Sequence, residues 1–174
     1  MTAQTRFEMS TARAASSVGI LSLGVDLLLH GGLLASHYVE LSPFLLDPQE
    51  AFRRIPFGYL TFLILTLGLY WLIRRLDVRG FVSGFRYGAV AGAVVWGALA
   101  IGLYSISTAT VPLLAGWWIG QALELGLAGA VIGASAAGAR LGRLWALVAL
   151  VVVVCFATTV ALQTIGWAPA VKVQ

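Results

Sequence analysis

The chain has 174 residues, of which 60% are hydrophobic and only 10% are charged. A soluble domain carries roughly 25% charged residues, so this chain lacks the polar surface that would coat a water-soluble globule. The formal net charge of +4 comes from arginines between apolar runs, and no basic stripe with interleaved aromatic residues indicates nucleic-acid binding. The single cysteine, Cys155, excludes an intrachain disulfide or a Cys-based metal site. The composition predicts a protein whose main solvent is lipid.

Five apolar runs are long enough to cross a bilayer, which takes about 20 residues of helix. Strands are excluded because the runs lack the alternation of a barrel strand, and lipid-exposed backbone must satisfy its own hydrogen bonds. The first run is too long for a signal-peptide core and is expected to remain as a helix. The predicted fold is an all-α, polytopic five-helix bundle with transmembrane helices over residues 18–37, 57–73, 85–104, 111–137 and 144–166. A polar tail (1–17), an external loop (38–56) and a C-terminal tail (167–174) flank or join them.

Arginine placement predicts the orientation of these helices. Eight arginines lie before the first helix or in the connections after the second and fourth: Arg6, Arg13, Arg74, Arg75, Arg79, Arg86, Arg140 and Arg143. The opposite side holds three basic residues, Arg53, Arg54 and Lys172. Because positive residues stay on the cytoplasmic side of a bilayer, the N-terminus is predicted to be cytoplasmic and the C-terminus external.

The external loop contains a helix start, Asp47-Pro48-Gln49-Glu50. Asp47 can cap, Pro48 suits the first turn, and Glu50 can complete a capping box. The segment from Pro48 to Ile55 is predicted to be a short helix in the membrane interface, with a plain connector as the alternative.

Glycines recur four residues apart on two of the predicted helices. The pairs are Gly88 and Gly92, Gly116 and Gly120, and Gly129 and Gly133. Small residues at this spacing let helix backbones approach closely in lipid, so these glycines are expected to face other helices.

Aromatic residues mark the ends of the predicted helices. Tyr38 and Trp117 are among those expected to anchor the chain at the membrane interface. Trp96 lies in the middle of its helix and is expected to pack against its neighbours.

Polar residues within the apolar runs form the candidate site. Asp26, His30 and His37 fall within about 40° of one another on an ideal helix, and the fourth predicted helix carries Gln121 and Glu124. An ionised residue at bilayer depth costs about 2.5–3.5 kcal/mol on insertion scales, so these five side chains are expected to face the bundle interior. They form either a proton, ion or polar-substrate site, or an interhelical hydrogen-bond cluster that locks the bundle.

Catalytic and cofactor chemistry finds little support. Asp26 and His30 have metal-ligand spacing with Glu124 as a possible third ligand, but a good site needs three or four ligands. Both histidines lie on one helix, which disfavours haem ligation within this chain. No hydrolase elbow, phosphate loop or zincin motif is present. We expect no enzyme activity, no metal and no cofactor.

Several motifs together carry a resemblance. They are Asp26-Leu-Leu-Leu-His30-Gly31, Phe85-Arg86-Tyr87-Gly88, Tyr104, Trp117 or Trp118, Gly120, Glu124, Ala128-Gly129 and Gly133. This set resembles uncharacterised small polytopic inner-membrane proteins of bacteria. The resemblance implies a shared pattern that includes Asp26, His30 and Glu124, without implying an activity. Together with the orientation predicted from the arginines, the expected location is the bacterial inner membrane with a periplasmic C-terminus.

Two functions of different classes are compatible with these features. Small size, glycine-rich faces and the lack of a catalytic motif favour a non-catalytic accessory or assembly subunit of a larger membrane complex. Its partners would be the bilayer and other membrane subunits or a second copy. The alternative is a small proton- or ion-linked transporter or channel that uses Asp26, His30 and Glu124. The first predicts outward-facing glycine stripes, and the second predicts a polar cavity.

Overall fold

The computed structural model describes residues 17–39 and 43–169, and in this part of the chain it is helical without strands. An N-terminal helix, Ser17–Leu33, ends in a π-helical turn, η1 (Leu29–Leu33). The remaining helices are α2 (Ser36–Val39), α3 (Pro48–Arg75), α4 (Phe81–Ile106), α5 (Val111–Ala136) and α6 (Leu141–Thr164). The predicted tails, residues 1–17 and 167–174, lie mostly outside the described residues.

Four helices, α3 to α6, are long and apolar enough to cross a membrane, and the N-terminal helix is a shorter apolar helix. The all-helical bundle with several such helices indicates a multi-pass membrane protein. The boundaries of α4, α5 and α6 lie within about four residues of the predicted spans. Long apolar runs set these boundaries, because only a helix satisfies their backbone in lipid.

The beginning of α3 corrects the sequence interpretation. A separate interfacial helix from Pro48 and a second helix from Phe57 were predicted, but one helix runs from Pro48 through Pro56 to Arg75. The proline removes only one backbone donor, a loss that membrane helices tolerate. The external loop is therefore much shorter than residues 38–56.

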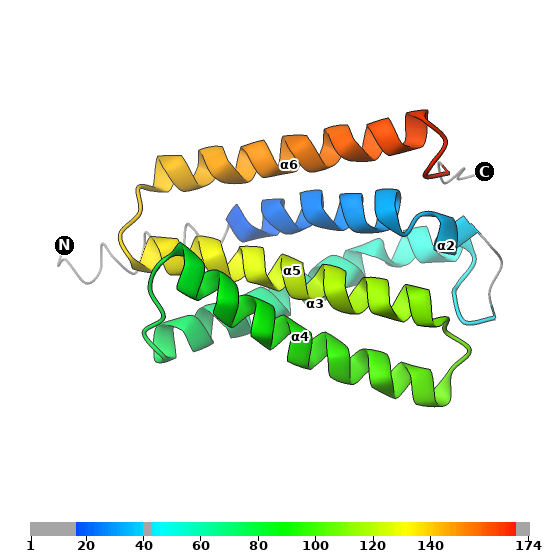
Figure 1. Cartoon of the computed structure of the whole chain (residues 1–174), viewed down its shortest axis with the longest axis horizontal. Helices are drawn as coiled ribbons and strands as arrows, with labels where there is room; N and C mark the ends of the chain where they lie inside the picture. Colours follow the sequence, from blue (N-terminus) through cyan, green and yellow to red (C-terminus); the bar gives the residue numbers. More distant parts are fainter. Residues whose placement is uncertain (1–16, 40–42, 170–174) are drawn as a thin grey trace.

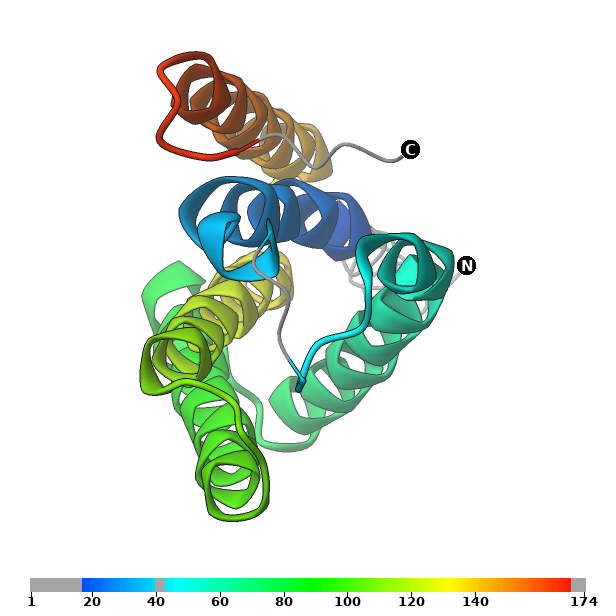
Figure 2. The ribbon, with the colours of Figure 1, turned by 90° about the vertical axis from the view of Figure 1, so that its right-hand side faces the viewer.

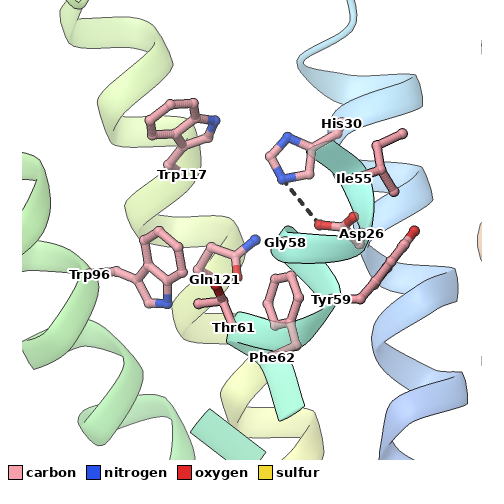
Figure 3. A pocket seen from close by; sticks show the side chains of 10 residues that line it. All are labelled: Asp26, His30, Ile55, Gly58, Tyr59, Thr61, Phe62, Trp96, Trp117 and Gln121. Atoms are coloured by element: carbon pink, nitrogen blue, oxygen red, sulfur yellow. Dashed lines mark ion pairs between the residues drawn. The ribbon is translucent and has the colours of Figure 1, made fainter. Parts of the chain in front are cut away.

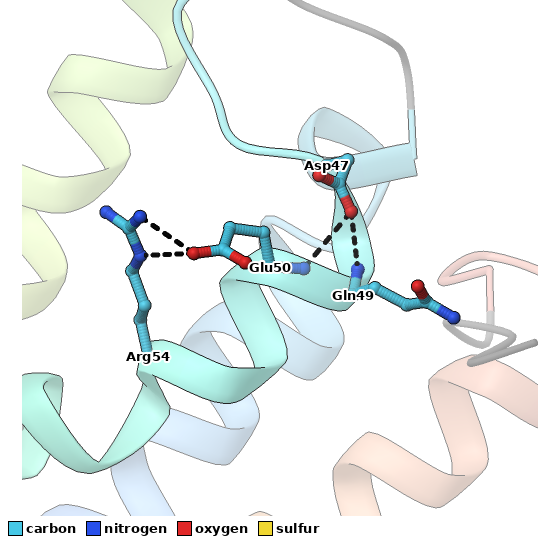
Figure 4. A network of polar contacts seen from close by, with 4 residues as sticks. All are labelled: Asp47, Gln49, Glu50 and Arg54. Carbon is cyan, nitrogen blue, oxygen red and sulfur yellow. Dashed lines mark hydrogen bonds and ion pairs between the residues drawn. The ribbon is translucent and has the colours of Figure 1, made fainter.

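The capping motif stabilises this long helix at its first turn (Figure 4). The carboxylate of Asp47 accepts hydrogen bonds from the backbone N–H groups of Gln49 and Glu50, at 3.0 and 3.1 Å. Glu50 does not complete a capping box with Asp47. Its carboxylate pairs with Arg54 one turn later, at 2.7 Å. The predicted Asp47 cap is confirmed. The i, i+4 ion pair between Glu50 and Arg54 stabilises the helical turn that precedes Pro56.

Helix α5 is the centre of the bundle. In its most apolar stretch 72% of the residues are buried, against 11% in α3 and α4 and 22% in α6. Figures 1 and 2 show α4 crossing one side of α5, while the N-terminal helix (blue) lies between α5 and α6. The apolar core includes Val18, Ile73, Ile132 and Val148 from four of these helices.

Glycines set the contact between α4 and α5. A Cβ atom on Gly88 would meet the backbone carbonyl of Leu125, and one on Gly129 would meet the carbonyl of Gly84. Gly92 and Gly133 likewise face backbone atoms of the other helix. The two backbones touch directly, as expected for small residues at this spacing.

The third predicted glycine pair contacts the N-terminal helix. Gly116 lies against the side chain of Leu34, and Gly120 lies against Leu29. All six predicted packing glycines therefore face another segment of this chain.

Candidate functional site

A cavity of about 300 Å³ lies between four helices (Figure 3). The N-terminal helix contributes Asp26 and His30, α4 contributes Trp96, and α5 contributes Trp117 and Gln121. One face of α3 completes the lining with Ile55, Gly58, Tyr59, Thr61 and Phe62. Polar groups of the predicted cluster thus line the same cavity as four aromatic side chains.

Asp26 and His30 form the predicted pair. His30 Nε2 lies 3.1 Å from Asp26 Oδ1, because residues four apart on a helix lie on the same face. Their side chains are only 20% and 32% exposed, respectively. Figure 3 shows the pair on the cavity wall that the N-terminal helix provides.

Tyr38 extends this pair toward α5. Its hydroxyl lies 2.6 Å from His30 Nδ1 and accepts a hydrogen bond from Trp117 Nε1 at 2.5 Å. An indole N–H only donates, so the arrangement that satisfies every group has the Tyr38 hydroxyl donating to Nδ1 and His30 Nε2–H donating to Asp26. We call these four residues, Asp26, His30, Tyr38 and Trp117, the hydrogen-bond chain.

The π-helical turn explains why Tyr38 occupies this position. Uniform α-helical geometry places His37 on the face of Asp26, but η1 and the two-residue turn that follows it change the helical phase. His37 lies in α2 and is absent from the cavity lining. The expectation that His37 joins the polar face stays a prediction.

The altered turn also frees a backbone carbonyl. Gln163 of α6 donates its side-chain N–H to the Gly31 carbonyl oxygen at 3.0 Å. This polar residue thus has a structural role, because it satisfies an acceptor released by the π-helical turn.

The polar residues of α5 behave differently from the hydrogen-bond chain. Gln121 is 2% exposed and Glu124 is 1% exposed. Within the described residues, Gln121 Oε1 and both carboxyl oxygens of Glu124 have no hydrogen-bond partner. The hydroxyl of Ser22 lies beside Glu124 but falls short of hydrogen-bond geometry. Trp96 Nε1, on the same side of the cavity as Gln121 in Figure 3, is also buried without a partner among the described residues.

The predicted cluster thus divides into three parts. Asp26 and His30 are paired, Gln121 and Glu124 are buried and unsatisfied, and His37 lies elsewhere. The sequence interpretation assigned Tyr38 and Trp117 only to interface anchoring and Trp96 only to packing. The hydrogen-bonding groups of Tyr38 and Trp117 were only a weak signal of a site, because residues that anchor a helix at the membrane interface have the same groups.

Metal binding finds no geometric support in the part of the chain that the structure describes. No three His, Cys, Asp or Glu side chains gather there in a way that could hold an ion. Glu124, the suggested third ligand, does not line the cavity that contains Asp26 and His30.

Comparisons with protein families, with curated proteins and with solved structures find no match to this chain.

Proposed function

We propose that this chain is a small proton-linked transporter in which Glu124, Asp26 and His30 handle the proton. The observation that carries the proposal is the carboxyl group of Glu124, which is 1% exposed in the central helix and has no hydrogen-bond partner among the described residues. Glu124 lies one turn along α5 from Gln121, which lines the cavity.

An unsatisfied carboxyl group argues against a purely structural cluster. A cluster that locks helices together does so through hydrogen bonds, and a buried polar group without them destabilises the fold. A carboxylate at this depth costs about 2.5–3.5 kcal/mol on insertion scales. A proton or a cation must therefore accompany Glu124, and exchange of that partner is the elementary step of a proton-linked carrier.

The groups around Glu124 fit this role. Asp26 on the N-terminal helix and Tyr59 on α3 are the titratable groups that interact electrostatically with it. The neighbouring turn of α5 packs against Ala89 and Gly92 of α4, which carry no charge. Among the described residues near Glu124, no arginine or lysine neutralises the carboxylate permanently.

The alternative proposal is a non-catalytic accessory or assembly subunit of a larger membrane complex. It predicts glycine stripes on the outer surface of the bundle. The six glycines expected to mediate packing instead contact other segments of the same chain, for example Gly88 of α4 against α5. Asp26, His30 and Gln121 line one cavity among mostly apolar residues, and this supports the transporter proposal over the accessory one.

We further propose five membrane crossings, with the N-terminus in the cytoplasm of a bacterium and the C-terminus in the periplasm. The N-terminal helix of 17 residues would span about 25 Å at 1.5 Å per residue, close to the roughly 30 Å hydrocarbon core. Figure 1 places the α3–α4 and α5–α6 connections, which carry Arg79 and Arg140, at the end where the N-terminal helix begins.

Proton movement in proteoliposomes tests the transporter proposal. A membrane potential imposed with a potassium gradient and valinomycin should drive protons inward, as followed by a trapped pH-sensitive dye. Glu124→Gln should abolish this uptake and retain the melting temperature, because an amide cannot carry the proton. Glu50→Gln, which removes a carboxylate from the exposed end of α3, should keep it. Uptake that is absent from the unmodified protein, or that persists in Glu124→Gln, would contradict the proposal.

A further inference from the structure

We propose that the cavity binds a small organic ammonium ion, with its N–H groups directed to Asp26 and Gln121 and its apolar body among the aromatic rings. This inference rests on the proposed proton-linked function, because it names the class of solute that would pass through the same cavity in addition to the proton. It is carried by the shape, the charge and the unsatisfied groups of the cavity.

The charge of the lining selects a cation. Asp26 is the only carboxylate among the residues that line the cavity, and none of them is Lys or Arg. His30 Nδ1 faces the Tyr38 hydroxyl and His30 Nε2 faces Asp26. The carboxyl group of Asp26 is therefore the one acidic group of the described lining, and it favours a cationic solute over an anionic one.

The aromatic rings favour an organic cation over a hydrated metal ion. Tyr59 and Phe62 from α3 lie opposite Trp96 and Trp117 from α4 and α5 (Figure 3). Aromatic faces attract ammonium groups through their quadrupole and bury apolar surface at the same time. A cavity of about 300 Å³ is at the lower end of the usual range for small-molecule sites, so the solute must be small.

Gln121 is the residue expected to accept a hydrogen bond from the ammonium ion. It is 2% exposed, it lines the cavity, and its Oε1 acceptor has no partner in the described part of the chain. An ammonium N–H would satisfy this acceptor and remove the penalty of leaving it unpaired. The site is therefore expected to distinguish ammonium ions that carry N–H donors from fully methylated ones.

Equilibrium binding to the full chain in detergent tests the inference, with benzylamine as the probe and calorimetry as the measurement. Benzyl alcohol and benzoate have a similar ring without the positive charge, and both should bind at least about tenfold more weakly, as expected for the loss of a charge-assisted hydrogen bond. Benzyltrimethylammonium retains the charge and lacks N–H groups, so it should also bind more weakly than benzylamine.

Two variants locate the binding. Asp26→Asn should weaken benzylamine binding at least about tenfold, whereas Asp77→Asn, a matched change at an exposed position outside the cavity, should leave it unchanged. Gln121→Leu should abolish the preference for benzylamine over benzyltrimethylammonium, which a purely structural role of Gln121 would not do. If Asp26→Asn does not fold, the Gln121→Leu result alone decides.

The outcomes separate this inference from the transporter proposal. No benzylamine binding, equal binding of benzyl alcohol, or unchanged binding in Asp26→Asn would overturn the ammonium site. Because binding is measured without a proton gradient, failure of the Glu124→Gln flux test would leave these results unaltered.

Discussion

At the scale of single residues, Tyr38 decides how the site is ordered. Its hydroxyl joins His30 of the N-terminal helix to Trp117 of α5, so it links two helices that are far apart in the sequence. Burial raises the pKa of this hydroxyl strongly, and the nearby Asp26 carboxylate adds to that effect while the bond from Trp117 opposes it. Tyr38 therefore keeps its proton at neutral pH and donates it toward His30.

Removal of this hydroxyl should destabilise the bundle. Tyr38→Phe retains the ring and leaves His30 Nδ1 and Trp117 Nε1 without their partner, which should cost about 1–3 kcal/mol of unfolding free energy. Thermal unfolding in detergent measures the effect. Tyr104→Phe, at a side chain that is 65% exposed, serves as the control. Equal melting temperatures for the two variants would show that the hydrogen-bond chain does not stabilise the fold.

The sequence predicts part of this site and misses part of it. Asp26 and His30 are paired as their four-residue spacing requires, and the burial of Glu124 follows from the cost of a carboxylate in lipid. The position of Tyr38 depends on the π-helical turn, and its contact with Trp117 spans 79 residues. Neither the turn nor the contact produces a local sequence pattern, so a uniform helical period predicted His37 on this face instead.

At the scale of helices, close approach of backbones and local breaks in helical geometry position the cavity. The α4–α5 contact is so close that backbone atoms occupy the space where side chains would lie at Gly84 and Gly88. Close packing of this kind replaces the hydrophobic force that is missing between helices in lipid. It also fixes Trp96 of α4 beside Gln121 of α5 in the lining of the cavity.

Two glycines of α4 provide a matched test of this packing. Gly88→Ala places a Cβ against the Leu125 carbonyl, so the helices must separate, and unfolding free energy should fall by about 1–3 kcal/mol. Gly102→Ala meets nothing within 4 Å and should be neutral or stabilising by up to about 1 kcal/mol, because alanine favours helix. Thermal unfolding of both variants would contradict this packing if Gly88→Ala were the more stable.

Helix boundaries illustrate which elements follow from composition. The start of α5 at Val111 matches the prediction, because an uninterrupted apolar run leaves little choice of structure. The start of α3 does not, because residues 48–55 were predicted to form a separate interfacial helix. The Asp47 cap and the Glu50–Arg54 pair instead hold the helix ahead of the proline. The polar contacts at its first turns therefore make α3 longer than the segment that its hydropathy predicts.

At the scale of the whole molecule, basic residues and the apolar core lie toward one end of the bundle, and the cavity lies toward the other. The α3–α4 and α5–α6 connections carry Arg79 and Arg140 at one end, and the apolar core near Val18 and Ile73 lies toward that end. The cavity lies toward the opposite end, near α2 and the beginning of α3. In the proposed topology, which puts the arginine end in the cytoplasm, the proposed ammonium site lies in the periplasmic half of the bundle.

This arrangement predicts the membrane topology. In bacterial cells, an enzyme reporter that works only in the periplasm should be active when fused after Gln174 and inactive when fused after Arg79. A reporter that works only in the cytoplasm should give the opposite pattern, because five crossings place these two positions on different sides. If both fusions report the same side, one of α4, α5 and α6 does not cross the membrane. A reporter placed ahead of Met1 tests the N-terminal helix, because five crossings put it on the side opposite to Gln174 and four crossings put both on the same side. Replacement of Arg74, Arg75 and Arg79 by glutamine should weaken the preference, since the proposed topology places these residues in the cytoplasm.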